Sequence, residues 1–114
     1  MTAGINLVVF PVSNLAQAKT LYSTLLGTAP YADQPYYVGF RVGDQEIGLD
    51  PNGHQKGQRG PLGYCAVSDV AASLQSLLDA GATLQQPVTD VGGGKRIAVV
   101  TDADGNTIGL IQSS

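Results

Sequence analysis

The sequence is poor in the residue types that most often carry chemistry or charge. In 114 residues it has one cysteine, one histidine, one methionine and no tryptophan, and only 13% of its residues are charged. A lone cysteine excludes a disulfide within the chain, and a net charge of −3 with scattered Lys and Arg argues against a basic surface for nucleic acid or an anionic membrane. No apolar run approaches the ~20 residues of a membrane-spanning helix, and no signal-peptide pattern is present. We therefore expect a cytoplasmic protein that binds neither nucleic acid nor membranes.

What the sequence does contain indicates a small folded domain. Hydrophobic residues make up 43% of the chain, and there are 15 glycines, a composition typical of compact proteins with β-structure rather than of disordered chains. A chain of this length is expected to form one domain, spanning residues 1–114.

Two short patterns each occur twice, which indicates a duplicated module. Val12-Ser13-Asn14-Leu15 leads into an amphipathic stretch, and Val67-Ser68-Asp69-Val70 leads into another. Ile47-Gly48-Leu49 is echoed in the same way by Ile108-Gly109-Leu110. Two half-length modules of the same build place equivalent residues in pairs, so a functional site can be looked for in both.

The boundaries follow from periodicity and from turn residues. The first module covers about residues 1–50, a polar linker with several glycines covers about 51–61, and the second module covers about 62–114. In the first module, strands are expected at residues 5–12, 36–42 and 46–50, a short edge strand between the prolines at 30 and 35, and a helix at 14–26.

The second module repeats this order. A strand over 62–67 precedes a helix that Asp69 caps and Gly81 ends, and strands follow near residues 83–86, 95–101 and 106–112. Each module therefore reads βαβββ. The predicted class is α+β, with two tandem modules forming a curved mixed sheet that has a concave cavity on one side and helices on its convex side.

This arrangement resembles the vicinal oxygen chelate superfamily, which includes glyoxalase I, extradiol dioxygenases, fosfomycin resistance enzymes and bleomycin resistance proteins. The resemblance covers essentially the whole chain. Its most specific part is the closing segment Asp102-Ala103-Asp104-Gly105-Asn106-Thr107-Ile108-Gly109-Leu110. It implies the fold, a homodimer as is common in the superfamily, and a small organic molecule as partner.

The resemblance also implies four places for metal ligands, two in each module. Here those positions are occupied by Leu7, Gly48, Leu62 and Gly109. None of these side chains offers a nitrogen, oxygen or sulfur donor, whereas a divalent metal needs several donors that converge. The sequence therefore predicts no metal and no cofactor at the usual site.

Strand alternation allows a metal-free pocket to be outlined. If Val38, Phe40 and Val42 face a helix, their alternate neighbours face the cavity. In the second module, Cys65 and Val67 are expected to face the helix in the same way. The residues predicted to bind a ligand are Leu7, Tyr37, Arg41, Gly48, Asp50, Leu62, Tyr64, Gly109 and Ile111. Such a set offers apolar walls and a few polar groups for orientation.

Structural interpretations stand beside these functional ones. Tyr37 and Tyr64 suit an ordinary sheet, Arg41 suits a cross-strand ion pair with Glu46 or Asp50, and the paired glycines suit either close packing or room for a ligand. His54 is interpreted as a solvated loop residue and Cys65 as core.

The sequence thus favours a metal-free protein that binds a small organic molecule, for instance sequestering a drug or metabolite in the manner of bleomycin resistance proteins. One alternative is a metal-dependent lyase or dioxygenase of the glyoxalase type, with His54, Glu46 and Asp50 as ligands. Another is a metal-free enzyme that uses Tyr37 or Tyr64 as acid or base.

Overall fold

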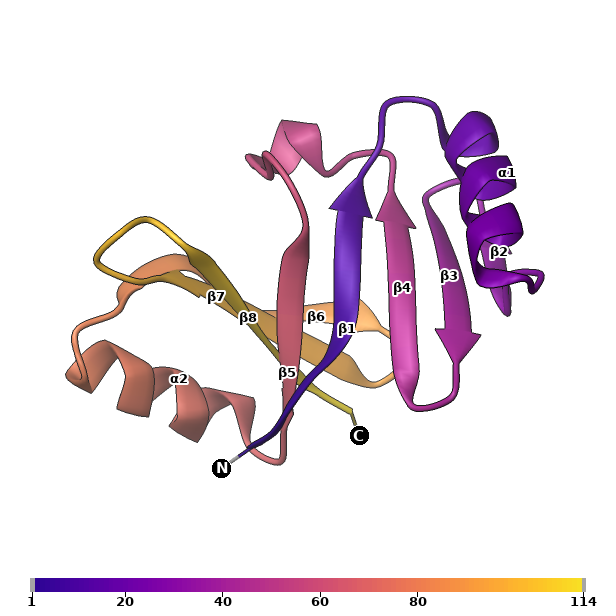
Figure 1. Ribbon diagram of the computed structural model, residues 1–114. Coiled ribbons are helices and arrows are strands. Elements are labelled where there is room, and N and C mark those ends of the chain that lie inside the picture. Colours follow the sequence, from indigo (N-terminus) through magenta and orange to yellow (C-terminus); the bar gives the residue numbers. More distant parts are fainter. Residues whose placement is uncertain (1, 114) are drawn as a thin grey trace. The chain divides into compact units, whose positions relative to one another are not determined.

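The computed structural model describes residues 2–113, which form two α-helices, eight strands and one short 3-10 helix (Figure 1). The contacts divide the chain into two compact units. The first unit is Asn6–Leu62, and the second is the segment from Gly63 onward together with the first residues of the chain, up to Ile5. The expected α+β class and the βαβββ order of both modules are confirmed.

The first unit contains a four-stranded mixed sheet. Its elements are β1 (Thr2–Pro11, which begins in the second unit), α1 (Leu15–Leu26), β2 (Ala32–Gln34), β3 (Tyr37–Val42), β4 (Gln45–Asp50) and the 3-10 helix η1 (His54–Lys56). The strand order is β2-β3-β4-β1. Strand β3 is antiparallel to both β2 and β4, and β4 is parallel to β1.

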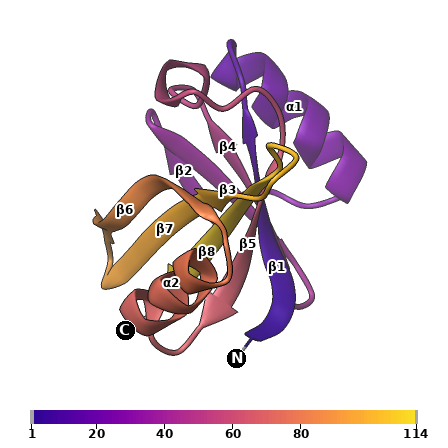
Figure 2. The same ribbon diagram turned by 90° about the vertical axis from the view of Figure 1, so that its left-hand side faces the viewer.

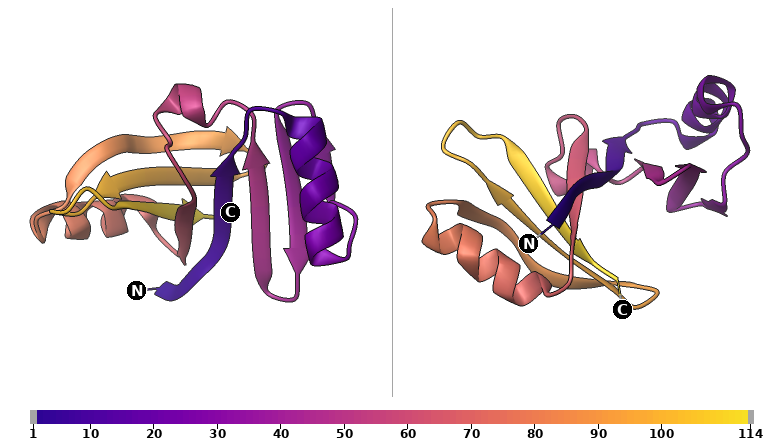
Figure 3. Two further views of the ribbon diagram at one scale, coloured as in Figure 1. Left: turned by 45° about the horizontal axis from the view of Figure 1, so that its top comes forward. Right: turned by 60° about the horizontal axis from the view of Figure 1, so that its bottom comes forward.

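Helix α1 covers one face of this sheet (Figure 3, left). Val38, Phe40 and Leu49 are fully buried beneath it. The residues packed against these three include Phe10, Val12, Leu15, Ala18, Tyr22 and Leu26. Burial of this apolar layer stabilises the unit and leaves the opposite face of the sheet without a helix.

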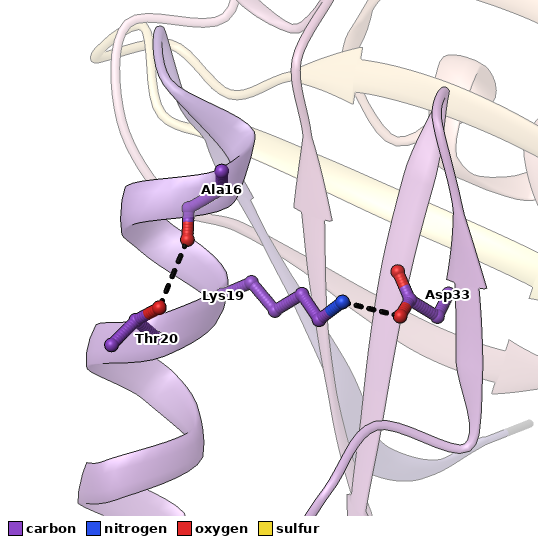
Figure 4. A network of polar contacts seen from close by, with 4 residues as sticks. All are labelled: Ala16, Lys19, Thr20 and Asp33. Carbon is purple, nitrogen blue, oxygen red and sulfur yellow. Dashed lines mark hydrogen bonds and ion pairs between the residues drawn. The ribbon is translucent and has the colours of Figure 1, made fainter.

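Both ends of α1 are capped, and the apolar face of the helix is narrow. Asn14 accepts a hydrogen bond from the Gln17 amide at 3.0 Å, and Gly27 ends the helix at a φ of 68°. Leu25, which the periodicity assigns to the packed face, is 70% exposed. Lys19 instead forms an ion pair with Asp33, which joins the helix to edge strand β2 (Figure 4).

The second unit repeats the architecture. Its elements are β5 (Leu62–Val67, whose first residue belongs to the first unit), α2 (Val70–Asp79), β6 (Thr83–Gly92), β7 (Lys95–Thr101) and β8 (Thr107–Gln112). The strand order is β5-β8-β7-β6, with β5 parallel to β8 and the other pairs antiparallel (Figure 2).

Helix α2 packs on one face of this second sheet (Figure 3, right). The buried residues of its core are Val67, Val70, Ala98 and Leu110, and Cys65, Leu74, Leu77 and Val88 pack against them. The predicted core placement of Cys65 is therefore confirmed. Asp69 accepts the Ala72 amide at 3.0 Å, and the side-chain oxygen of Gln112 accepts the Val70 amide at 2.8 Å, so two amides of the first helical turn are satisfied.

Two expectations about the strands need correction. The strand predicted to end at Gln86 continues to Gly92, through Pro87. This is tolerated because β6 is an edge strand with irregular register on both sides of Gln86, where a residue without an N–H breaks no ladder bond. Val42, expected to face the helix, is exposed at the end of β3.

Among the described residues, neither helix is long and apolar enough to cross a membrane.

Candidate ligand-binding site

The helix-free face of the first sheet carries most of the predicted site. Because side chains alternate along a strand, the burial of Val38 and Phe40 under α1 directs Tyr37, Gly39 and Arg41 to the other face. Directly paired residues share a face. Gly39 pairs with Gly48 and Arg41 pairs with Glu46, and on the other side of β4 Leu7 also pairs with Glu46. The common face expected for Leu7, Tyr37, Arg41 and Gly48 is thus present.

Tyr37 lies over Gly48 from the neighbouring strand. A Cβ atom built on Gly48 would lie 2.6 Å from the Cζ atom of Tyr37 and 2.7 Å from its Cε1 atom, distances that real Cβ atoms essentially never show. The phenol of Tyr37 thus occupies the space that a side chain at position 48 would fill. Of the two interpretations of this glycine, close packing within the sheet therefore has a direct structural cause.

Tyr31 covers the other glycine of the pair. A Cβ atom on Gly39 would lie 3.1 Å from the ring of Tyr31, which precedes β2. The sequence predicts only a short edge strand between the prolines at 30 and 35 and indicates no role for this tyrosine. Gly39 itself was the available signal, because a glycine inside a strand often marks the close approach of another group.

Three polar groups meet at this end of the face. The hydroxyl of Tyr31 donates to Oε1 of Glu46 at 2.5 Å, and Nη2 of Arg41 lies 3.6 Å from the same oxygen. The guanidinium carbon of Arg41 lies 4.4 Å from the centroid of the Tyr31 ring. Of the two partners considered for Arg41, Glu46 forms the ion pair, and the stacked ring of Tyr31 is an additional contact.

The environment favours the neutral phenol of Tyr31. Partial burial raises the pKa of Tyr31 to about 12, and the hydrogen bond to Glu46 and the negative charge of that carboxylate act in the same direction. Arg41 acts in the opposite direction with less effect. Tyr31 is therefore a hydrogen-bond donor at neutral pH, which keeps Glu46 engaged.

Asp50 is occupied by the linker. Its Oδ1 accepts the Asn52 amide at 2.8 Å, and its Oδ2 pairs with Nζ of Lys56 at 3.0 Å. The carboxylate thereby fixes the turn that leads into η1. The structure brings Asp50 to the end of the strand that carries Gly48, but the contacts described for its side chain are with the linker.

The second sheet also has a tyrosine ring packed on a strand glycine, formed by other residues. Gly109 pairs directly with Tyr64 on β5, and a Cβ atom on Gly109 would lie 2.5 Å from Cδ1 and 2.7 Å from Cε1 of that ring. Tyr64 is only 7% exposed. Ile111 lies on the same face two residues along β8, so the predicted Tyr64, Gly109 and Ile111 are brought together. Leu62 is buried at the first residue of β5.

The four family positions do not suit a metal ion. Leu7, Leu62 and the two glycines supply no donor, and the space beside each glycine holds a tyrosine ring. Among residues 2–113, no three His, Cys, Asp or Glu side chains lie close enough together to hold a metal. The alternative set of His54, Glu46 and Asp50 is therefore not assembled, since Glu46 binds Tyr31 and Asp50 binds Lys56.

Comparison with known proteins identifies the family. A family model described as the Glyoxalase/Bleomycin resistance protein/Dioxygenase superfamily matches residues 4–110. The chain belongs to this superfamily. The resemblance inferred from the repeated motifs and the closing hairpin is thus confirmed. Among curated proteins, none matches the chain.

Several solved structures share the fold of this chain at low sequence identity. Methylmalonyl-CoA epimerase from Mycobacterium tuberculosis is 22% identical, with a TM-score of 0.78, over 99% of this chain and 89% of that one. A superfamily member from Vibrio splendidus is 12% identical, with a TM-score of 0.73, over 95% of this chain and 97% of that one. The Mn(II)-bound glyoxalase from Novosphingobium aromaticivorans is 16% identical, with a TM-score of 0.71, over 97% of this chain and 39% of that one.

Proposed function

We propose that this protein binds a small organic molecule without a metal ion, on the helix-free sheet face that carries Tyr37, Gly39, Arg41, Glu46 and Gly48. The observation that carries the proposal is the tyrosine ring packed beside each glycine at a family metal position. A metal-dependent member needs an acidic or similar donor there, and here a phenol ring takes its space. What the face offers instead is aromatic surface and one ion pair.

One structural neighbour is described as Mn(II)-bound, and fold similarity at 16% identity does not decide whether this chain binds a metal. The residues on the face support metal-free binding. We propose sequestration of a drug or metabolite as the concrete role, in a cytoplasmic homodimer. Size-exclusion chromatography with light scattering tests the dimer.

The test compares ligand and metal effects on the same preparation. We expect chelator treatment to leave the melting temperature unchanged, and a compound library to contain molecules that stabilise the chelated protein in proportion to ln(1 + [L]/Kd). A stoichiometric divalent metal in the purified protein, with loss of melting temperature on chelation, would contradict metal-free binding and favour the lyase or dioxygenase alternative.

A pair of adjacent tyrosines provides the matched variants. Tyr37→Leu removes the ring over Gly48 and should weaken binding of a library hit. Tyr36→Leu changes an exposed neighbour outside β3 and should leave binding unchanged. Equal affinities in both variants would place the ligand elsewhere. Recovery of a chemically altered hit after long incubation would instead favour a metal-free enzyme.

A further inference from the structure

The Tyr31–Arg41–Glu46 cluster differs from an ordinary surface ion pair in how its groups share their contacts. Glu46 Oε1 receives the Tyr31 hydroxyl at 2.5 Å, whereas the nearest Arg41 nitrogen lies 3.6 Å away, beyond hydrogen-bond distance. Tyr31 therefore makes the close hydrogen bond to the carboxylate, and Arg41 balances its charge from a longer distance.

The two charged side chains also differ in their exposure to solvent. The side chain of Arg41 is 57% exposed, and that of Glu46 is 23% exposed. A guanidinium has five N–H donors in a fixed plane and suits two-pronged contacts with carboxylate or phosphate. The accessible charge of the cluster is thus the cation.

The Tyr31 ring orients the plane of the Arg41 guanidinium before a ligand binds. The Tyr31 ring lies 4.4 Å from the guanidinium carbon, and that ring is itself packed on Gly39. A stacked guanidinium loses less conformational freedom when it binds an anion than a free arginine side chain would. Aromatic surface from Tyr31 and Tyr37 lies on the same sheet face.

We propose that Arg41 anchors the ligand through an anionic group, a carboxylate or a phosphate monoester, while the organic part of the ligand lies along the tyrosine-covered glycines. Tyr31 and Glu46 act as positioning residues for Arg41. This proposal rests on the proposed small-molecule function and specifies the chemistry of its ligand.

Three probes of similar shape separate charge from shape: benzoate, phenyl phosphate and neutral benzamide. Binding is measured by titration of backbone amide shifts in two-dimensional NMR spectra. We expect benzoate or phenyl phosphate to bind at least about tenfold more tightly than benzamide, because charged hydrogen bonds contribute that much. The tighter of the two anions identifies which acid group the site prefers.

Two arginine variants localise the effect. Arg41→Gln should remove the preference for the anions and leave benzamide affinity unchanged. Arg41→Lys should retain only part of the preference, since lysine keeps the positive charge but lacks the planar set of N–H donors. Arg59→Gln, at an exposed arginine of the linker, is the matched control and should keep the full preference. Thermal melts of each variant verify that it is folded.

The outcomes separate this proposal from the broader one. Equal binding of anions and benzamide, an anion preference that survives Arg41→Gln, or no shift with any probe overturns the arginine anchor. Library compounds that bind the wild type and Arg41→Gln equally would leave small-molecule binding intact while removing this anchor. Failure of every library compound would remove the function itself.

Discussion

The two sheets use one backbone plan and carry different chemistry on their helix-free faces. Gly48 pairs with Val9 and Gly39, and Gly109 pairs with Tyr64 and Val99, so the two glycines are equivalent. By the same register, the cross-strand pair formed by Arg41 and Glu46 corresponds to a threonine pair. The corresponding threonines are Thr101 and Thr107.

This difference shows which features the duplication retained. Both units keep a glycine with a tyrosine over it, but Tyr37 reaches Gly48 with the far end of its ring and Tyr64 lies over Gly109 with the near edge of its ring. At the equivalent positions compared, the first unit has the charged residues Arg41, Glu46 and Asp50, and the second has Thr101, Thr107 and Ile111. Recognition of a charged ligand group is therefore expected on the first unit's face.

The largest expected effect on stability is at Gly109, which packs against the nearly buried ring of Tyr64. Gly109→Ala forces a methyl group against Cγ, Cδ1 and Cε1 of a nearly buried ring on the directly paired strand, so neither partner can yield cheaply. We expect a loss of about 2–3 kcal/mol in the free energy of unfolding, as for overpacked cores. Urea denaturation followed by circular dichroism measures it. Recovery in the Gly109→Ala/Tyr64→Leu double variant would assign the loss to this contact.

Gly48→Ala should cost less, about 1 kcal/mol. The overlapping atoms are the hydroxyl, Cζ and Cε1 at the far end of Tyr37, a half-buried side chain that can turn away. Alanine also reduces the entropy of the unfolded chain, which offsets part of the strain. The same denaturation experiment measures which of the two glycine variants loses more free energy of unfolding. An equal or larger loss for Gly48→Ala would contradict the distinction between a movable and a fixed tyrosine.

Tyr31→Phe is expected to change stability at alkaline pH. The folded pKa of Tyr31, about 12, exceeds its ordinary value of 10.0, so the unfolded chain loses this proton first as pH rises. The resulting stabilisation is complete below pH 10.0 and disappears as pH rises toward 12. Tyr31→Phe should lower the free energy of unfolding by about 1 kcal/mol at neutral pH, the ordinary net value of a hydrogen bond. It should also reduce the loss of stability at alkaline pH.

Denaturation curves at several alkaline pH values measure this effect, with Tyr36→Phe as the exposed control. An unchanged pH dependence in Tyr31→Phe would show that the hydrogen bond to Glu46 is not maintained in solution. Ultraviolet titration of tyrosinate provides an independent readout, because one tyrosine fewer should titrate at the high end of the curve.

The architecture and one face of the site were predictable from the sequence, for specific reasons. Caps at Asn14 and Asp69 and the period-two pattern of 38–42 depend on neighbouring residues, so they can be recognised locally. The role of Tyr31 was not predictable, because its contacts with Gly39 and Glu46 depend on how β2 is placed beside β3. The engagement of Asp50 by Lys56 likewise depends on the path of the linker.

The smallest expected effect concerns the hairpins that join the equivalent strands. A two-residue turn at Gly43 joins β3 to β4, whereas between β7 and β8 the Asp102 carboxylate accepts the amides of Asp104 and Asn106 and the Asn106 side chain, each at 2.9 Å. The Asn106 side chain contributes most to the lowered pKa of Asp102.

A lowered folded pKa means that the unfolded chain protonates first in acid. The stabilisation from Asp102 is therefore present above its ordinary pKa of 3.8 and is lost as pH falls through the lower folded value. Asp102→Asn should lower stability slightly at neutral pH and reduce its dependence on pH in acid, as measured by urea denaturation across the acid range. Asp44→Asn, in the first unit's turn, is the matched control for the charge change. If both variants behaved alike, the second hairpin would owe its stability to its backbone turn, as the first does, and this difference between the units would disappear.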